Sequence, residues 1–486
     1  MSAIEIGKAI KEGQLTAVQA TEQVLRDAEK YNPSLNAYIT ISKEQALLQA
    51  ELVQKEIENG KAVSPLAGVP IAIKDNICTK GILTTCASKI LSNYTPIYDA
   101  TVVSSLHNNG AIIIGKLNMD EFAMGSTSET SYYGSCKNPW DSERVPGGSS
   151  GGAASAVAGR IAPMALGSDT GGSIRQPASY CGVTGFKPTY GMVSRYGLIA
   201  YASSLDQIGP ISVDATDCAA IMDIISGKDH FDGTSLEIGD KQFLSSLSGD
   251  IKGLRIGLFK ECYANAGLDG DVANSTLLAS ETLKAAGAII EEVSLPFLDY
   301  AIPTYYIIAT AEASSNLSRF DGIKYGYRAE EFDGIVDLFS STRSEGFGKE
   351  VKNRILMGTF VLSSGFFDAY YRKALKVKSI IKKAFDDVFT KFDIIMCPTA
   401  PTTAPKLGTS LTNPMAMYLS DVFTVSANIA GLPCISIPCG FDCNNMPIGV
   451  QMIGAPLMDK KVLNAAYTYQ QLTEWHRKVL NIRETL

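Results

Sequence analysis

The feature that most constrains this 486-residue chain is the stretch 146–189, in which two glycine-rich loops flank one short segment. The first loop reads Pro-Gly-Gly-Ser-Ser-Gly-Gly from residue 146, and the second reads Gly-Ser-Asp-Thr-Gly-Gly-Ser from residue 167. Glycines beside each serine leave backbone N–H groups bare and let other segments approach closely, as an anion hole requires. The stretch predicts a helix over 149–158 and a buried strand over 162–167, which together bring two serines to one edge of a sheet.

The same stretch resembles the signature of the amidase family, whose members cleave amide C–N bonds with a Ser-Ser-Lys triad. The resemblance implies that Ser173 is the acyl-forming nucleophile. It also implies that Ser149 is the bridging serine, held by a cis peptide from Gly148. The third member should end an upstream strand, and Lys74 is the single charged residue in the apolar run 67–74. Lys74 can act as a base only if it is neutral, and burial lowers the pKa of a lysine.

The resemblance further implies that an oxyanion hole is formed by the backbone amides of the residues that lead to Ser173, namely Thr170, Gly171 and Gly172. We expect Asp169 and Arg175 to lock this loop by an ion pair or by hydrogen bonds to the backbone, without a catalytic role. Without the resemblance, two plainer interpretations stay open: a glycine turn followed by a capping serine, and an ordinary salt-bridged lysine at a strand end.

A rival motif overlaps the first loop, because residues 147–151 also match the G-x-S-x-G nucleophile elbow of α/β-hydrolases. That interpretation requires a histidine after the serine. His230 lies in a charged, loop-like stretch and His476 lies near the end of the last predicted helix, so the rival is the weaker hypothesis. We expect His107, His230 and His476 to be surface or satisfied polar residues.

Apolar periodicity along the chain predicts an α/β fold, with a large mixed central sheet covered by helices on both faces. Capping patterns predict helix starts after Thr16, Asp99 and Asp214. We expect one domain over residues 1–486, with the signature core at about 65–225. A helical insertion at about 305–390 should lie beside the active site, with its many aromatic side chains mostly in the core.

Composition narrows the classes of function. The net charge of −7 disfavours direct binding of nucleic acid over the surface as a whole. The ten cysteines form no CxxC pair, so we expect buried thiols, no disulfide and no metal site. The chain contains no apolar run long enough for a membrane helix and no signal peptide, and therefore a cytoplasmic protein is expected.

Within the amidase family, segments 124–131, 311–322 and 420–431 resemble most closely the glutaminase subunits of tRNA-dependent amidotransferases. The resemblance implies that glutamine is hydrolysed through an acyl-enzyme and that the ammonia serves to convert Glu-tRNA(Gln) to Gln-tRNA(Gln). It implies partner B and C subunits, of which the B subunit uses ATP and Mg and binds most of the tRNA. The chain itself is expected to need no cofactor.

Free glutamine carries a carboxylate and an ammonium group, so its pocket needs one cation and one anion. By resemblance Arg354 binds the carboxylate and Asp421 the ammonium, with Tyr305 and Ser128 nearby; an arginine fork suits a carboxylate. A solvated helix charge and a helix cap are the plainer interpretations of Arg354 and Asp421. Two other functions stay open: a stand-alone amidase for small or aryl amides, and an inert scaffold for tRNA.

Overall fold

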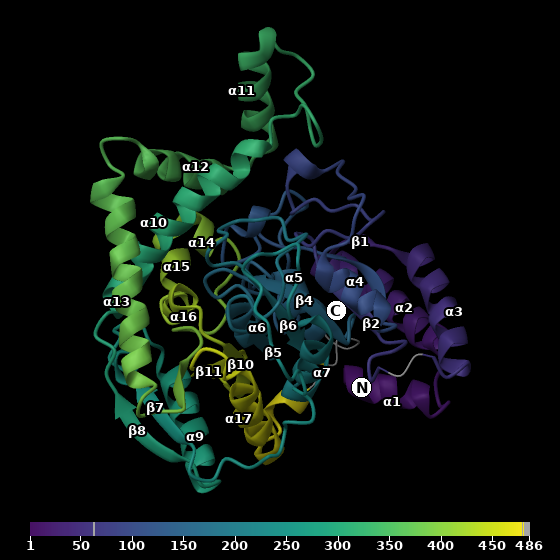
Figure 1. Ribbon diagram of the computed structural model, residues 1–486, viewed down its shortest axis with the longest axis vertical. Helices are drawn as coiled ribbons and strands as arrows, with labels where there is room; N and C mark the ends of the chain where they lie inside the picture. The colour runs from purple at the N-terminus through teal and green to yellow at the C-terminus, as the bar shows by residue number, and fades with distance from the viewer. Residues whose placement is uncertain (62–63, 479, 481–486) are drawn as a thin grey trace.

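The computed structural model describes residues 1–61, 64–478 and 480, in which eleven strands form one mixed sheet (Figure 1). The strand order is β1-β3-β2-β4-β6-β5-β10-β11-β9-β7-β8. Their bounds are β1 Tyr38–Ile41, β2 Pro70–Lys74, β3 Ile112–Leu117, β4 Met164–Asp169, β5 Thr184–Lys187, β6 Gln207–Ser212, β7 Arg255–Phe259, β8 Ile289–Val293, β9 Ile394–Pro398, β10 Cys434–Phe441 and β11 Pro447–Gly454. Strand β2 runs parallel to both of its neighbours, β3 and β4, whereas the centre from β4 to β9 is antiparallel. The predicted mixed sheet is confirmed.

Helices cover both faces of this sheet, because alternate side chains of its strands are apolar on both sides. In β2, Ile71 and Ile73 join one core cluster and Ala72 joins another, as a period of two requires. The first face is covered by α1 (Ala3–Lys11), α4 (Thr101–Asn108), α7 (Ala215–Ile225), α9 (Gly270–Ala285) and α17 (Asp459–Leu472). The second is covered by α2 (Ala17–Leu35), α3 (Lys43–Glu58), α5 (Gly151–Ala158), α6 (Arg175–Cys181), α10 (Leu298–Asn316), α13 (Lys373–Val388) and α16 (Val425–Ala430).

Local capping explains where several helices begin. The hydroxyl of Thr16 accepts the N–H of Gln19 at 3.0 Å in a capping box, and the carboxylate of Asp214 accepts the N–H of Asp217, so both predictions are confirmed. The prediction for Asp99 is wrong: the N-cap of α4 is Ala100, which has no side-chain bond to the helix. Asp99 instead accepts the N–H of Lys80 at 2.7 Å, which fastens a neighbouring loop.

The helical insertion begins earlier than predicted, at Leu298, and comprises α10, α11 (Gly334–Gly346), α12 (Lys349–Leu362) and α13. Helix α12 packs on α10, while α11 projects from the body at the top of Figure 1. The prediction that its aromatic residues lie mostly in the core is partly wrong. Tyr305, Tyr306 and Phe320 are buried, but Phe366 is 39% and Tyr370 is 41% exposed. These two rings pack on each other at the surface after α12.

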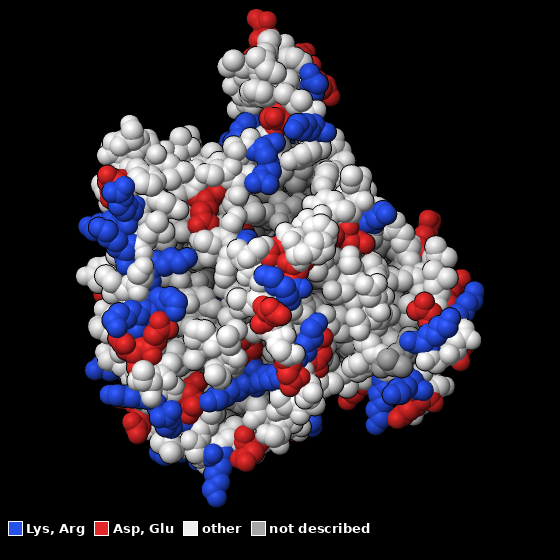
Figure 2. All heavy atoms as spheres, viewed as in Figure 1, with Lys and Arg blue, Asp and Glu red and all other residues white. Residues whose placement is uncertain are grey.

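Charged side chains of both signs are interspersed over the face shown in Figure 2, and lysines gather over α13. Two of these lysines, Lys382 and Lys383, pair with acidic residues one turn away. Nine of the ten cysteines are buried, and all are free thiols. Among the helices of the described residues, none is long and apolar enough to cross a membrane.

Candidate active site

Lys74 is the last residue of β2, and its side chain reaches a cluster of serine oxygens between β2, β4 and the start of α5. Its Nζ lies 2.8 Å from Ser149 Oγ, 2.8 Å from Ser150 Oγ and 3.0 Å from Ser168 Oγ. The side chain is fully buried and belongs to none of the salt bridges among the described residues. The strand-end salt bridge that stayed open as an alternative is therefore wrong for Lys74; it is the neighbouring Asp75 that pairs with a lysine, Lys116.

Burial controls the protonation of Lys74. Removal from water lowers its pKa from 10.5 to about 7, while the carboxylates of Asp120, Asp169 and Asp206 oppose this effect. The amine is thus substantially neutral near neutral pH, and a neutral amine has a lone pair with which to accept a proton. Its nearest hydroxyls, those of Ser149 and Ser150, are the groups with which it can exchange that proton.

In the first glycine loop, the residue before Ser149 has no room for a side chain. The peptide Gly148–Ser149 is cis, as the family resemblance implied. A Cβ on Gly148 would lie 2.1 Å from Asp120 Oδ2, so only glycine fits there. The N–H of Gly148 donates to Gln176 Oε1 at 3.0 Å, which ties the loop to α6.

Ser173 approaches the same cluster from the second loop. Its carbonyl accepts the N–H of Ser150 at 3.1 Å, which joins the two loops directly. Ser173 is 7% exposed, whereas Lys74 and Ser149 have no exposed surface, so Ser173 is the member of the three that borders solvent. In the part of the chain that the structure describes, no hydrogen bond links the hydroxyls of Ser149 and Ser173.

The second loop is held by the ion pair predicted for it. Arg175 Nε lies 3.1 Å from Asp169 Oδ2, and both side chains are fully buried. Asp169 also accepts the N–H of Gly172 at 2.8 Å and that of Ile174 at 3.1 Å. Burial opposes its ionisation, but the Arg175 guanidinium holds the pKa of Asp169 below the ordinary value. The expected locking role is confirmed.

This arrangement modifies the predicted oxyanion hole. Because the Gly172 amide already donates to Asp169, it is engaged within the loop rather than open to an incoming oxygen. Gly171 lies beneath the ring of Tyr305, and a Cβ there would meet that ring at 2.6 Å. The amides of Thr170 and Gly171 remain the candidates among the three residues named from the sequence.

Two buried opposite charges lie beside the loop. Arg354, on α12, is 3% exposed; its Nε donates to Glu350 Oε1 at 2.8 Å and its Nη1 to the Tyr201 hydroxyl at 2.7 Å. Asp421 is 6% exposed and accepts a hydrogen bond from the Ser126 hydroxyl. Burial raises the pKa of Asp421 to about 7, an effect that Ser126 and Arg354 oppose.

Tyr305 and Ser128 occupy different surroundings. Tyr305 is 5% exposed and faces Gly171, so it lies next to both the loop and the pair of charges. The Ser128 hydroxyl accepts the N–H of Gly151 at 3.1 Å and lies 3.5 Å from the Ser149 carbonyl oxygen. Its present contacts are therefore with the backbone of the first loop, and a role in substrate binding stays a prediction.

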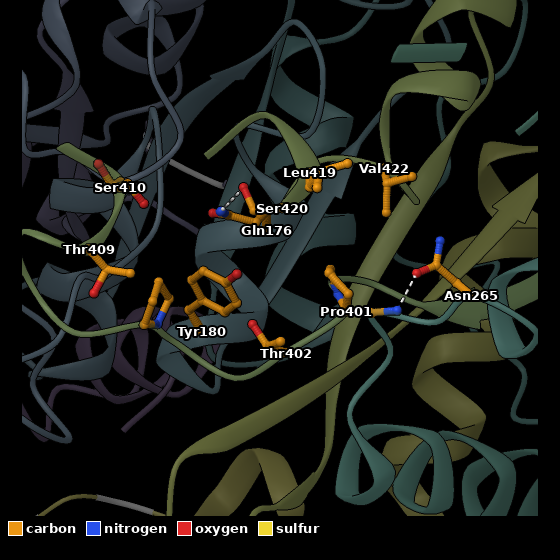
Figure 3. A pocket seen from close by; sticks show the side chains of 13 residues that line it. Gln176, Tyr180, Asn265, Pro401, Thr402, Thr409, Ser410, Leu419, Ser420 and Val422 are labelled. Atoms are coloured by element: carbon orange, nitrogen blue, oxygen red, sulfur yellow. Dashed lines mark hydrogen bonds between the residues drawn. The ribbon is translucent and has the colours of Figure 1, made fainter. Parts of the chain in front are cut away.

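A cavity of about 310 Å³ adjoins this region, lined by uncharged side chains that include Gln176, Tyr180, Thr402 and Ser420 (Figure 3). Ser420 directly precedes Asp421 in the chain. Gln176 Nε2 lies 3.4 Å from Ser420 Oγ and, on the same side chain, Oε1 accepts the Gly148 amide. The cavity thus borders both the first loop and the segment that carries Asp421.

The histidines lie elsewhere. His230 is exposed beside Asp229, and His107 contacts Gln49. His476 departs from the prediction, because it is buried and its Nδ1 has no hydrogen-bond partner in the described residues; burial lowers its pKa to about 4. No hydrogen bond among those residues connects a histidine to either serine loop, and no cluster of three or more metal-ligating side chains occurs there.

Several polar residues of the site were missed from the sequence. Ser150 and Ser168 contact Lys74, and Tyr201 supports Arg354. Asp206 accepts the Thr170 hydroxyl at 2.7 Å. An acidic residue directly before the buried strand β6 was a signal for Asp206, whereas nothing local distinguished Tyr201 from the other tyrosines.

Comparison with known proteins shows the family of this chain. The chain matches the Amidase family over residues 19–463. It is 58% identical to the A subunit of the glutamyl-tRNA(Gln) amidotransferase of Lachnospira eligens, covering 97% of this chain and 98% of that protein. The crystal structure of the corresponding protein from Thermotoga maritima has a TM-score of 0.79 and 41% identity, covering 96% of this chain and 93% of that chain. Because the family match extends from α2 into α17 and so includes every strand of the sheet, this chain belongs to the amidase family.

Proposed function

We propose that this chain is the glutaminase component, the A subunit, of a glutamyl-tRNA(Gln) amidotransferase. It hydrolyses glutamine and supplies ammonia for the conversion of Glu-tRNA(Gln) to Gln-tRNA(Gln). The relatives from Lachnospira eligens and Thermotoga maritima support this assignment over nearly the full length of both chains.

The choice of glutamine as the substrate rests on one hydrogen-bonding atom of Arg354 and one of Asp421. Arg354 Nη2 and Asp421 Oδ1 are both buried, and neither has a hydrogen-bond partner in the described residues. A buried donor or acceptor atom without a partner is costly, so these two atoms are expected to meet a ligand. The α-carboxylate of glutamine fits Nη2 and its α-ammonium fits Oδ1, which places the side-chain amide toward the serine loops.

The proposed chemistry uses Lys74, Ser149 and Ser173 as the catalytic residues. Ser173 Oγ attacks the amide carbon, its proton passes to Ser149, and Ser149 passes its own proton to neutral Lys74. The amides of Thr170 and Gly171 stabilise the oxyanion. Ammonia leaves after receiving a proton back from Lys74 through Ser149, and a γ-glutamyl ester remains on Ser173. Water then attacks this ester by the same route and releases glutamate.

The remaining steps belong to the partners. We assign the use of ATP and Mg and most contacts with Glu-tRNA(Gln) to the B subunit, with a C subunit completing a heterotrimer in the cytoplasm. This chain needs no cofactor for the hydrolysis described above. Its net charge of −7 agrees with leaving the RNA to a partner.

The test is glutamine hydrolysis by the chain co-purified with its cellular partners. Ser173→Ala should abolish ammonia release; unchanged release would support the inert scaffold. Arg354→Ala should raise the KM for glutamine far more than that for an aryl amide without an α-carboxylate, because only glutamine loses its charge partner. Lys349→Ala removes an exposed cation from the same helix and serves as the control. Equal effects on both substrates, with no partner recovered, would favour the stand-alone amidase.

A further inference from the structure

Asp206 is a buried carboxylate that belongs neither to the triad nor to the proposed glutamine pocket. It contacts residues that support each of them. It is 2% exposed. Its Oδ1 accepts the Thr170 hydroxyl at 2.7 Å, and its Oδ2 accepts the backbone N–H groups of Tyr201 and Ala202, each at 3.0 Å. The N–H of Asp206 donates to the Ala202 carbonyl at 2.8 Å, which closes the turn onto itself.

The two groups held by Asp206 lead to opposite ends of the bound substrate. Thr170 begins the loop whose amides face the reacting carbonyl. Tyr201 leads to the other end, because its hydroxyl accepts Arg354 Nη1 at 2.7 Å and the guanidinium carbon lies 5.5 Å from its ring centre. A single carboxylate therefore connects the oxyanion loop to the arginine that faces the α-carboxylate.

We propose that Asp206 is a positioning residue that holds the oxyanion loop and Arg354 at a fixed separation, so that one glutamine contacts both at once. This inference rests on the proposed function for the identity of the substrate. Correct placement matters because a displacement of about 1 Å at a reacting group can cost about a hundredfold in rate. A carboxylate suits the task, since its two oxygens accept three donors together, whereas asparagine offers one acceptor oxygen.

Asp206 also contributes charge to the site, and this gives a readout that a purely structural role would not move. Lys74 faces Asp120, Asp169, Asp206 and Cys86, and all three carboxylates raise its pKa against the effect of burial. Asp206 itself faces Thr170 and Arg195, and burial raises its pKa to about 6, so it is ionised above neutral pH. Loss of its charge should lower the pKa of Lys74 further.

The test compares Asp206→Asn with Asp459→Asn in the full chain with its partners. Asp459 is a matched control: it is 1% exposed and likewise accepts a threonine hydroxyl and a backbone N–H, both from Thr189, but at the start of α17. Asp206→Asn should lower kcat about 10- to 100-fold, raise the KM for glutamine and move the acidic limb of the pH profile to lower pH. Asp459→Asn should leave kcat, the KM for glutamine and the acidic limb of the pH profile close to those of the wild type.

A double mutant isolates the connection to Arg354. In an Arg354→Ala background, Asp206→Asn should still lower kcat but should no longer raise the KM for glutamine. Any of three results would overturn the proposal. Asp206→Asn and Asp459→Asn could lose equal activity, or the acidic limb could stay in place in Asp206→Asn. In the Arg354→Ala background, Asp206→Asn could still raise the KM for glutamine as much as it does in the wild type. If Asp206→Asn does not fold, two other variants test the proposal. Thr170→Val should lower kcat and leave KM unchanged, and Tyr201→Phe should raise KM and leave kcat unchanged. Any other combination of effects on kcat and KM would overturn the proposal.

Failure of the proposed function would look different. In that case the wild type would turn over an aryl amide but not glutamine. The kcat and pH-limb measurements on Asp206→Asn would then be made with the aryl amide, since they depend on the oxyanion loop and Lys74. Absence of both effects with that substrate would overturn the role of Asp206 independently.

Discussion

The basicity of Lys74 gives the sharpest prediction. Burial lowers its pKa from 10.5 to about 7. At pH 7.5 about three quarters of the amine is then neutral, compared with about one part in a thousand at the ordinary pKa. Burial therefore increases the population of the competent base by a factor of several hundred. The kcat at saturating glutamine should rise with a midpoint near pH 7 and reach a plateau below pH 9.

Lys74→Met tests this reasoning, because it keeps the length of the side chain but removes the amine. It should lower kcat by several orders of magnitude and abolish the rise near pH 7. The assay is ammonia release by the assembled complex between about pH 5.5 and 9.5. An active Lys74→Met enzyme that keeps the wild-type pH profile would refute the role of the lysine, as would a wild-type midpoint near 10.

The same pKa makes an independent prediction about stability. The folded pKa lies below the unfolded value, so between about pH 7 and 10.5 the unfolded chain binds more protons at this residue than the folded chain. The free energy of unfolding of the wild type should therefore rise with pH across this window relative to that of Lys74→Met. The full difference amounts to about 5 kcal/mol. Urea denaturation at pH 7 and pH 9.5 should detect about 3 kcal/mol of this difference, and parallel pH dependence in both proteins would contradict the buried neutral amine.

Three further predictions concern the surroundings of the triad. Burial raises the pKa of Asp421 to about 7, so the KM for glutamine should fall as pH rises through 7 and the carboxylate ionises; Asp421→Asn should remove this dependence. Asp169→Asn leaves the buried cation of Arg175 without its anion and should lower the free energy of unfolding by about 3–5 kcal/mol in urea denaturation at pH 7. Since the pKa of Asp169 is held below its ordinary value, this contribution should be lost as pH falls below about 4. Gly148→Ala places a Cβ 2.1 Å from Asp120 Oδ2 and should lower the free energy of unfolding by about 1–3 kcal/mol and abolish ammonia release; an active, stable variant would disprove the close approach.

Local patterns in the sequence predicted most of the elements because each depends on near neighbours in the chain. Continuous apolar runs predicted β2 and β4. Capping residues predicted α2 and α7, but the same reasoning was wrong at Asp99, where a loop offered its carboxylate another backbone donor. Aromatic residues after α12 were assigned to the core because periodicity does not reveal where a helix leaves the body of the protein.

The sequence by itself determined which reactive residues the chain carries: a lysine at the end of an apolar strand, two serines in glycine loops, and an aspartate and an arginine near enough in the chain to pair. These are short-range facts, fixed by residue type and spacing. The tertiary structure decided which groups remain unpaired. It engaged the Gly172 amide with Asp169, removed Lys74 from water far enough to lower its pKa, and joined Asp206 to both loop and pocket. Such properties depend on the order of strands and on burial, which bring distant segments together and which no local pattern encodes.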